Sequence, residues 1–165
     1  KIHAANFCFI SDGSIITCAK RTGLLEPGDN FFGYKSVLKS LETKIGELHV
    51  VVAKKYNATR LFVYGELFGG EYPHPNVTPD TSVEAVQTGI YYSPNIEFCA
   101  FDIAIEGSDG IHKYLDFEVS LALFKQVGIL YSVPLFTGTY EATLNYNIKF
   151  ESTIPKLLDL PPLPS

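Results

Sequence analysis

The sequence has little that would place it in a membrane or outside the cell. No stretch approaches the ~20 consecutive apolar residues that a membrane-spanning helix needs, and the first residues lack the pattern of a secretory signal peptide. The content of 46% hydrophobic and 19% charged residues excludes a disordered chain and is typical of a soluble globular protein. A length of 165 residues predicts one domain with a substantial core.

Cysteine is also scarce. Cys8, Cys18 and Cys99 are odd in number and do not have the spacing of metal ligands. We therefore predict reduced thiols on strand positions and no metal-ligating residues. Reduced thiols fit an intracellular compartment, which the sequence does not resolve among cytoplasm, nucleus and mitochondrion.

Basic residues are fewer than acidic ones. The chain has 13 Lys and Arg against 18 Asp and Glu, which gives a formal net charge of −5. Affinity for nucleic-acid phosphates comes from clustered Lys and Arg side chains, so this balance argues against a broad nucleic-acid-binding surface. Any such contact requires a local basic patch or residues outside this chain.

The patterns along the first part of the chain predict strands around one long helix. Residues 2–10 and 14–19 are rich in β-prone residues and flank a Ser-Asp-Gly turn, which predicts a hairpin. Apolar residues recur at helical spacing over 34–56, and Asn57 follows where a left-handed residue often ends a helix. Residues 60–66 read as a buried strand that ends in a carboxylate.

The second part of the chain alternates loops with shorter elements. A Pro-, Gly- and Thr-rich loop over 69–89 precedes a buried strand over 97–105. Asp116 is expected to cap a helix to residue 126 that Gly128 closes. The remaining predictions are a turn at 108–110, strands over 111–115 and 132–136, short helices near 140–146 and 152–158, and a linker-like tail over 160–165. Together these patterns predict an α+β fold.

The first residue is the most reactive candidate if its surroundings are apolar. A lysine must lose its proton before it attacks a phosphate, and its ordinary pKa is ~10.4. Burial among apolar residues lowers that pKa and frees the lone pair. Lys1 stands before Ile2, Ala4 and Phe7. A solvated terminal lysine is the plain alternative.

Four further side chains stand at places where they would enter a cleft. Arg21 follows the predicted hairpin, and its planar guanidinium can bind a ribose or a phosphate. Glu66 ends an apolar strand, where a carboxylate must face a cleft or be buried at a cost. Phe101 can stack on a base beside Asp102. The alternatives are a surface ion pair, a solvated carboxylate and a core phenylalanine.

The ordered motifs Lys1-Ile2-His3-Ala4-Ala5-Asn6-Phe7, Lys20-Arg21, Tyr64-Gly65-Glu66-Leu67-Phe68-Gly69 and Phe98-Cys99-Ala100-Phe101-Asp102-Ile103 have a counterpart in a known family. In this order they resemble the nucleotidyltransferase domain of the ATP-dependent RNA ligases, specifically the RNA ligase 2 group with the trypanosome RNA-editing ligases. The resemblance covers residues 1 to at least 114. It implies antiparallel sheets flanked by helices around an ATP cleft.

The resemblance also implies roles for single residues. Lys1 would carry AMP covalently, with His3 and Asp102 as further catalytic residues. Asn6, Arg21, Glu66 and Phe101 would bind the nucleotide. The implied cofactors are ATP and Mg²⁺, and the implied partners are RNA 5′-phosphate and 3′-hydroxyl ends, with no membrane and no identified protein. RNA repair or RNA editing is the implied setting.

Three departures from the family pattern keep alternatives open. Ala4 stands where the family has glycine, and the chain contains no Glu-Gly-x-Val-x-Lys segment and no later Lys-x-Lys. The family strand that precedes the lysine is absent too. We therefore expect residues 1–165 to be an adenylation domain incomplete at both ends and inactive alone in full ligation. The alternatives are a non-catalytic relative that binds nucleotides or RNA ends, and a DNA ligase or capping-type nucleotidyltransferase, in which aspartate usually replaces His3.

Overall fold

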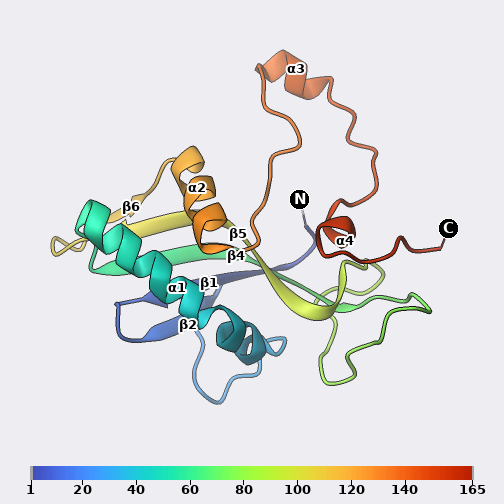
Figure 1. The fold of residues 1–165 in the computed structure, drawn as a ribbon, viewed down its shortest axis with the longest axis horizontal. Coiled ribbons are helices and arrows are strands. Elements are labelled where there is room, and N and C mark those ends of the chain that lie inside the picture. The colour runs from blue at the N-terminus through green and yellow to red at the C-terminus, as the bar shows by residue number, and fades with distance from the viewer. Residues whose placement is uncertain (1, 165) are drawn as a thin grey trace.

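A computed structural model describes residues 2–164 as an α+β fold, which confirms the predicted class (Figure 1). The strands are β1 (Ala5–Ser11), β2 (Ile16–Lys20), β3 (Gly23–Leu24), β4 (Arg60–Glu71), β5 (Ser93–Glu106) and β6 (His112–Tyr114). The helices are α1 (Tyr34–Tyr56), α2 (Phe117–Val127), α3 (Tyr140–Leu144) and α4 (Ile154–Leu157).

The strands form a 6-stranded sheet in the order β3-β2-β1-β4-β5-β6. Every neighbouring pair in it is antiparallel. Helices α1 and α2 lie on one side of this sheet, whereas α3 lies on a projecting loop and α4 returns close to the N-terminal segment (Figure 1). The two longest strands, β4 and β5, are neighbours, and β1 and β4 form the middle of the sheet.

The core lies between the sheet and the two longer helices. Phe7 and Phe9 of β1 contact Phe98 of β5 with ring centroids 6.0 Å and 4.9 Å apart. Each of these rings is at most 3% exposed, and burial of a phenylalanine contributes about 1.5–3 kcal/mol to stability. The helices complete this cluster with Val37, Ile45, Leu48 and Val52 of α1 and Leu123 and Phe124 of α2.

Several boundaries agree with the sequence prediction. The hairpin of β1 and β2 forms, and α1 begins and ends at the predicted residues. Asn57 has the expected left-handed conformation, with φ 54° and ψ 36°. Gly128 likewise ends α2 with φ 76°. Asp116 occupies the N-cap position of α2, but its side chain makes no capping hydrogen bond.

Two predictions about strands were wrong in extent or in kind. Strand β4 continues to Glu71, into the expected loop, and β5 begins at Ser93, before the expected start at residue 97. Gly69 permits this continuation, because a Cβ at that position would lie 2.1 Å from the carbonyl oxygen of Asn95. The strand predicted over 132–136 does not form: Tyr131 makes a single isolated bridge to Ala100, and the chain then leaves the sheet.

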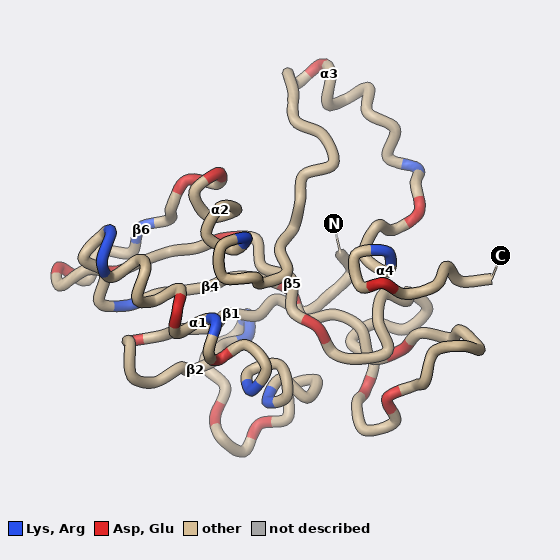
Figure 2. The backbone as a smooth tube through the Cα atoms, in the orientation of Figure 1, with Lys and Arg blue, Asp and Glu red and all other residues tan. Residues whose placement is uncertain are grey.

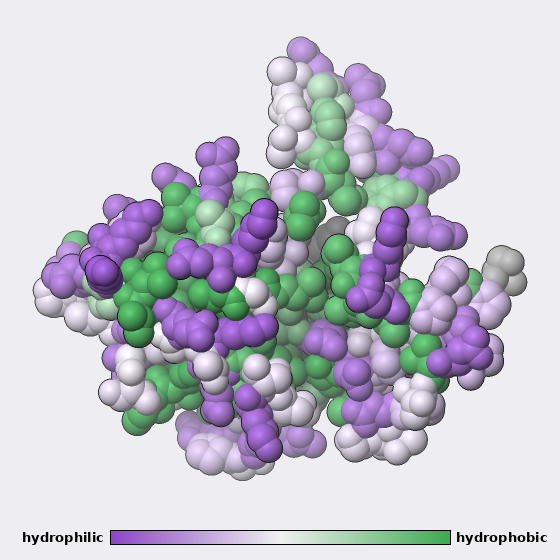
Figure 3. Space-filling view, in the orientation of Figure 1, coloured by the Kyte–Doolittle hydropathy of each residue, from purple (hydrophilic) through white to green (hydrophobic). Residues whose placement is uncertain are grey.

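The segment after this bridge carries many exposed apolar side chains. It projects from the body of the molecule around α3, and apolar surface runs along it (Figure 3). Its exposed members are Val133, Leu135, Phe136, Tyr140, Leu144, Tyr146, Ile148 and Phe150. Phe136 and Tyr146 stack with ring centroids 5.2 Å apart, so these two side chains cover part of each other's apolar surface.

Gly65 fixes the approach of β4 to β5. A Cβ built at Gly65 would lie 2.4 Å from the Phe98 ring and 2.5 Å from the carbonyl oxygen of Cys99. We therefore expect Gly65→Ala to lower the free energy of unfolding by about 1–3 kcal/mol, the usual cost of overpacking a core. Urea denaturation followed by circular dichroism measures this change.

The matched control is Gly28→Ala, because nothing lies within 4 Å of a Cβ at that position. We expect its unfolding curve to stay close to that of the wild-type protein. Equal stability of both alanine variants would contradict the close contact between Gly65 and Phe98.

Candidate functional site

The face of the sheet opposite α1 and α2 carries most of the polar candidate residues, and we call it the open face. Successive side chains of a strand point to opposite sides of a sheet. Since Phe7, Val63 and Leu67 belong to the core beneath the helices, their neighbours Asn6, Tyr64 and Glu66 belong to the open face.

Asn6 and Glu66 lie directly opposite each other on β1 and β4, and Glu66 is in turn opposite Cys99 of β5. Asn6 is exposed, and Glu66 is half-buried. Burial, with a smaller contribution from the Glu66 carboxylate, raises the pKa of the Cys99 thiol to about 11. This thiol is therefore protonated at neutral pH. Glu66 is the acidic group of the row that Asn6, Glu66 and Cys99 form across the sheet.

Phe101 occupies an irregularity of the sheet. Tyr64 pairs with Asp102, and the next residue, Gly65, pairs with Ala100, so Phe101 has no partner on β4. Such a bulge bends its strand and changes the direction of a side chain. The backbone of Ala100 makes two further hydrogen bonds of 2.8 Å. Its N–H donates to the carbonyl oxygen of Leu130, and its carbonyl oxygen accepts from the N–H of Ser132. The backbone that carries the half-buried Phe101 side chain is therefore anchored at the preceding residue.

Asp102 is partly buried next to the bulge. Its position opposite Tyr64 puts it on the open face, two residues along β4 from the position of Glu66. Burial raises its pKa above the ordinary value of 3.8. Because this carboxyl holds its proton more tightly than a solvated one, the side chain can serve as a proton acceptor in a less acidic range.

Arg21 and its neighbour Lys20 have separate environments. Lys20 pairs with Phe7, and its Nζ lies 5.7 Å from the centroid of the Phe31 ring, among aromatic side chains of the helix side. Arg21 is exposed and lies in the turn between β2 and β3, one residue past the Lys20–Phe7 pair that ends the β1–β2 ladder. Its chain position is therefore near this end of the ladder, but it has no paired position opposite Asn6.

Of the two candidates before β1, only His3 lies within the described residues. Lys1 lies outside the described residues. The side chain of His3 is exposed, and its backbone N–H donates a hydrogen bond of 3.2 Å to the hydroxyl of Tyr92.

Ala4 can occupy the position that is glycine in the family pattern. It is not one of the non-glycine residues with positive φ within residues 2–164, which are Phe32, Asn57 and Asp159. Its methyl group packs against a cluster of Phe68, Tyr92 and Cys99. Since the backbone at Ala4 avoids the left-handed region, the methyl group causes no backbone strain.

The glycines around Glu66 have an explanation in the packing of the sheet. A Cβ at Gly65 or Gly69 would collide with atoms of β5. The close approach of β4 to β5 therefore requires both glycines.

A polar network that was not predicted from the sequence lies at the other end of the open face. The Tyr64 hydroxyl lies 3.2 Å from His112 Nε2, and His112 Nδ1 lies 3.1 Å from Glu106 Oε1. Arg60 donates to the other Glu106 oxygen at 2.9 Å. Burial is the main reason why the pKa of Tyr64 is raised. The two-residue alternation of His112 and Tyr114 was the available signal, because it places both rings on one face.

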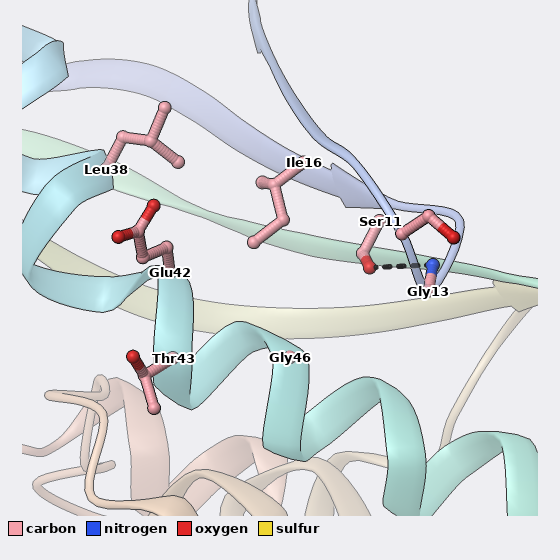
Figure 4. Close-up of a pocket in the computed structure, with 8 residues that line it drawn as sticks. Ser11, Gly13, Ile16, Leu38, Glu42, Thr43 and Gly46 are labelled. Carbon is pink, nitrogen blue, oxygen red and sulfur yellow. Dashed lines mark hydrogen bonds between the residues drawn. The ribbon is translucent and has the colours of Figure 1, made fainter.

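The hollows of the molecule lie elsewhere. One, of about 380 Å³, is bounded by the β1–β2 turn and α1 (Figure 4). There the Gly13 N–H donates to Ser11 Oγ at 3.2 Å, and Glu42 and Thr43 come from the helix. A second hollow of about 360 Å³ adjoins it along Ile16 and Leu38. Neither contains a sequence-predicted site residue.

Charge is spread thinly over the chain. Figure 2 shows Lys and Arg on several elements, interspersed with Asp and Glu. No helix within the described residues is long and apolar enough to cross a membrane. The same residues contain no group of three or more His, Cys, Asp and Glu side chains that could hold a metal ion.

Comparison with solved structures gives the class of the fold. A Naegleria gruberi RNA ligase with PPi superposes with a TM-score of 0.51 at 16% identity, over 83% of this chain and 34% of that chain. A variant of the same ligase with ATP and Mn has a TM-score of 0.51 at 14% identity, over 83% and 35% of the two chains. The fold is thus that of the corresponding part of the Naegleria RNA ligase.

Sequence comparison is more specific. The RNA ligase family profile matches residues 1–156. The mitochondrial RNA-editing ligase 2 of Trypanosoma brucei brucei is 33% identical over 97% of this chain and 43% of its own length. The mitochondrial RNA-editing ligase 1 is 29% identical over 97% and 40%. The chain belongs to the RNA ligase family, and it spans about two fifths of the length of these curated relatives.

The raised pKa of Asp102 predicts a pH-dependent effect on stability. The folded protein holds this proton more tightly than the unfolded chain does, so the ionised carboxylate lowers stability above the raised pKa. This penalty disappears as the pH falls below the ordinary value of 3.8. We expect Asp102→Asn to increase the free energy of unfolding at pH 7 and to lose this advantage in acid.

Denaturant titrations of both proteins across this pH range measure the effect. The control is Glu47→Gln, which changes an exposed carboxylate of α1 and should give a small difference. A stability difference for Asp102→Asn that stays constant from neutral pH into acid would contradict the effect of burial on this carboxyl.

Proposed function

We propose that this chain provides the adenylation site of an ATP-dependent RNA ligase, which joins RNA 5′-phosphate and 3′-hydroxyl ends through a lysyl-AMP intermediate. The observation that carries the proposal is the pair on the open face, where Asn6 lies opposite Glu66, with the exposed Arg21 one residue past the end of the β1–β2 ladder. Lys1 precedes the same strand by a few residues. The relatives in the trypanosome are named as RNA-editing ligases.

The first step transfers AMP to the protein. The unprotonated Nζ of Lys1 forms a bond to the α-phosphorus of ATP. The bond from that phosphorus to its bridging oxygen breaks, pyrophosphate leaves with the electron pair, and the lysine releases its proton to solvent. Splitting a difficult transfer into two easier ones is the general advantage of such a covalent intermediate.

The next two steps join the RNA. A 5′-phosphate oxygen attacks the phosphorus of the adduct, the bond from that phosphorus to Lys1 Nζ breaks, and the departing amine takes up a proton from solvent. The RNA end is then activated by AMP. A 3′-hydroxyl then attacks the 5′-phosphorus, loses its proton and releases AMP. Asp102 is proposed as a proton acceptor near the reacting groups, because its partial burial raises its pKa.

The remaining candidates are assigned by their chemistry. The Glu66 carboxylate accepts a hydrogen bond from a ribose hydroxyl, and the Asn6 amide and Arg21 guanidinium donate to phosphate or ribose oxygens. Phe101 stacks on the adenine base. The exposed His3 imidazole is assigned to the RNA end or a phosphate. Each assignment follows the family pattern. Asn6, Glu66 and Phe101 lie on β1, β4 and β5, whereas His3 and Arg21 lie outside these strands.

The metal that such a reaction uses is Mg²⁺, which neutralises charge on the phosphate oxygens. Magnesium is usually bound by one or two carboxylates together with substrate phosphates. No larger group of potential ligands exists in the described part of the chain. The donor set therefore fits a metal that enters with the nucleotide and does not fit a resident ion. The buried free thiols support an intracellular setting.

Covalent adenylation gives the most direct test. We expect incubation of the protein, in its longest natural form, with ATP and Mg²⁺ to add one adenylyl group, and we expect Lys1→Ala to abolish this adduct. Intact-mass spectrometry measures it. Lys54→Ala, which changes an exposed lysine of α1, is the matched control and should adenylate normally.

The result separates the proposed enzyme from its alternatives. An adduct with GTP and not ATP would indicate a capping-type nucleotidyltransferase. The absence of any adduct would contradict the enzyme and leave a relative that binds nucleotides or RNA ends.

Glu66→Gln tests the nucleotide assignment. Replacing the carboxylate weakens a charge-assisted hydrogen bond of about 1.5–3 kcal/mol, so we expect the rate of adenylation at low ATP concentration to fall about 10- to 100-fold. Quench-flow measurement of the adduct gives this rate. Glu71→Gln, at the exposed end of β4, should leave it unchanged, and equal rates for the two variants would remove Glu66 from the site.

A further inference from the structure

The N-terminal segment is attached to the body of the protein by Tyr92. The hydroxyl of Tyr92 accepts a hydrogen bond of 3.2 Å from the backbone N–H of His3, 89 residues away in the sequence. The Tyr92 side chain is 7% exposed, and its ring meets the Phe68 ring edge-on at 5.9 Å. A buried tyrosine hydroxyl usually has a hydrogen-bond partner, and here the partner is main chain.

Apolar contacts surround this hydrogen bond. Phe68, Tyr92 and Cys99 form a buried cluster against which Ile2 and Ala4 pack; we call this cluster the N-terminal seat. It is completed by Ile90, Leu130 and by Ile154 and Leu158 in and beside α4. Figure 1 shows the N-terminal end of the chain beside α4, as these contacts require.

The seat holds a segment that the sheet does not hold. Strand β1 begins at Ala5, and residues 2–4 have no regular secondary structure. Ile2 and Ala4 face the seat, and the intervening His3 has an exposed side chain but a bonded N–H. This alternation fixes both the direction and the register of the backbone before it enters β1.

We propose that Tyr92 is a positioning residue for the adenylation reaction. Its hydroxyl fixes the backbone two residues after Lys1, and thereby limits where the attacking amine can be relative to the row of Asn6 and Glu66. This inference rests on the proposed function. Small displacements of a reacting group are costly, and a shift of about 1 Å can reduce a rate about 100-fold.

Tyr92 lies just before β5 and belongs to the N-terminal seat, which is separate from the main core beneath the helices. Tyr92 is buried, whereas the adjacent Tyr91 is only half-buried. The seat lies on the open face, because Phe68 and Glu66 are two residues apart on β4 and Cys99 is opposite Glu66. The hydrogen bond thus joins the nucleophile segment to the same face that carries the nucleotide candidates.

Tyr92→Phe is the decisive variant, because it keeps the ring on Phe68 and removes only the acceptor. We expect amide exchange at His3, measured by NMR, to become about tenfold faster, the equivalent of one hydrogen bond. We also expect the rate of lysyl-AMP formation at saturating ATP to fall about tenfold, with KM for ATP within about twofold and the melting temperature nearly unchanged. Tyr91→Phe is the matched control and should match the wild-type protein in all these measurements.

Each result decides a part of the proposal. Wild-type exchange at His3 in Tyr92→Phe would overturn the attachment itself, whatever the activity. Faster exchange with an unchanged adenylation rate would overturn the positioning role, and an effect on KM alone would assign Tyr92 to nucleotide binding. If the wild-type protein forms no adduct, the proposed function fails and the positioning role with it, while the exchange measurement still decides whether Tyr92 holds the segment.

Discussion

The pairing of β4 with β5 is the constraint that places the candidate side chains. Because side chains alternate between the two faces of a sheet, Val63 and Ile103 in the core commit Tyr64 and Asp102 to the opposite face. A slip of one residue would exchange the faces and bury the carboxylates beneath α1. The contact of Gly65 with the Phe98 ring makes such a slip costly, so the same contact that closes the core also fixes the register of the site.

Local sequence patterns predicted the elements whose causes are local. Helix α1 follows from its apolar period and from Asn57, and the β1–β2 hairpin follows from its turn residues. The predicted placement of a carboxylate at the end of an apolar strand led to Glu66, although its position opposite Asn6 depends on pairing across the sheet. The bulge at Phe101 could not be predicted, because it exists only relative to β4. The strand expected over 132–136 failed for the same reason: β5 offers it a partner at Ala100 alone.

Two basic side chains of this chain already have partners within the protein, which limits how RNA could be bound. Lys20 lies over the Phe31 ring, and Arg60 is paired with Glu106. Neither leaves its full charge for a phosphate, and the other basic residues are scattered among acidic ones (Figure 2). A continuous basic track is therefore missing from the described residues, and nonspecific attraction of RNA by charge alone would be weak.

The acidic character of the open face also restricts how a nucleotide could lie on it. Burial raises the pKa of Glu97 as well as that of Asp102, and an approaching phosphate would raise both further, because like charges repel. For the proposed nucleotide, we therefore expect the triphosphate to lie away from the β5 carboxyls and toward Arg21, which follows the end of β2. The uncharged ribose and base would then face Glu66 and Phe101, and the phosphates would lie toward the segment that follows Lys1. Such an orientation would arise from repulsion at one end of the face as much as from attraction at the other.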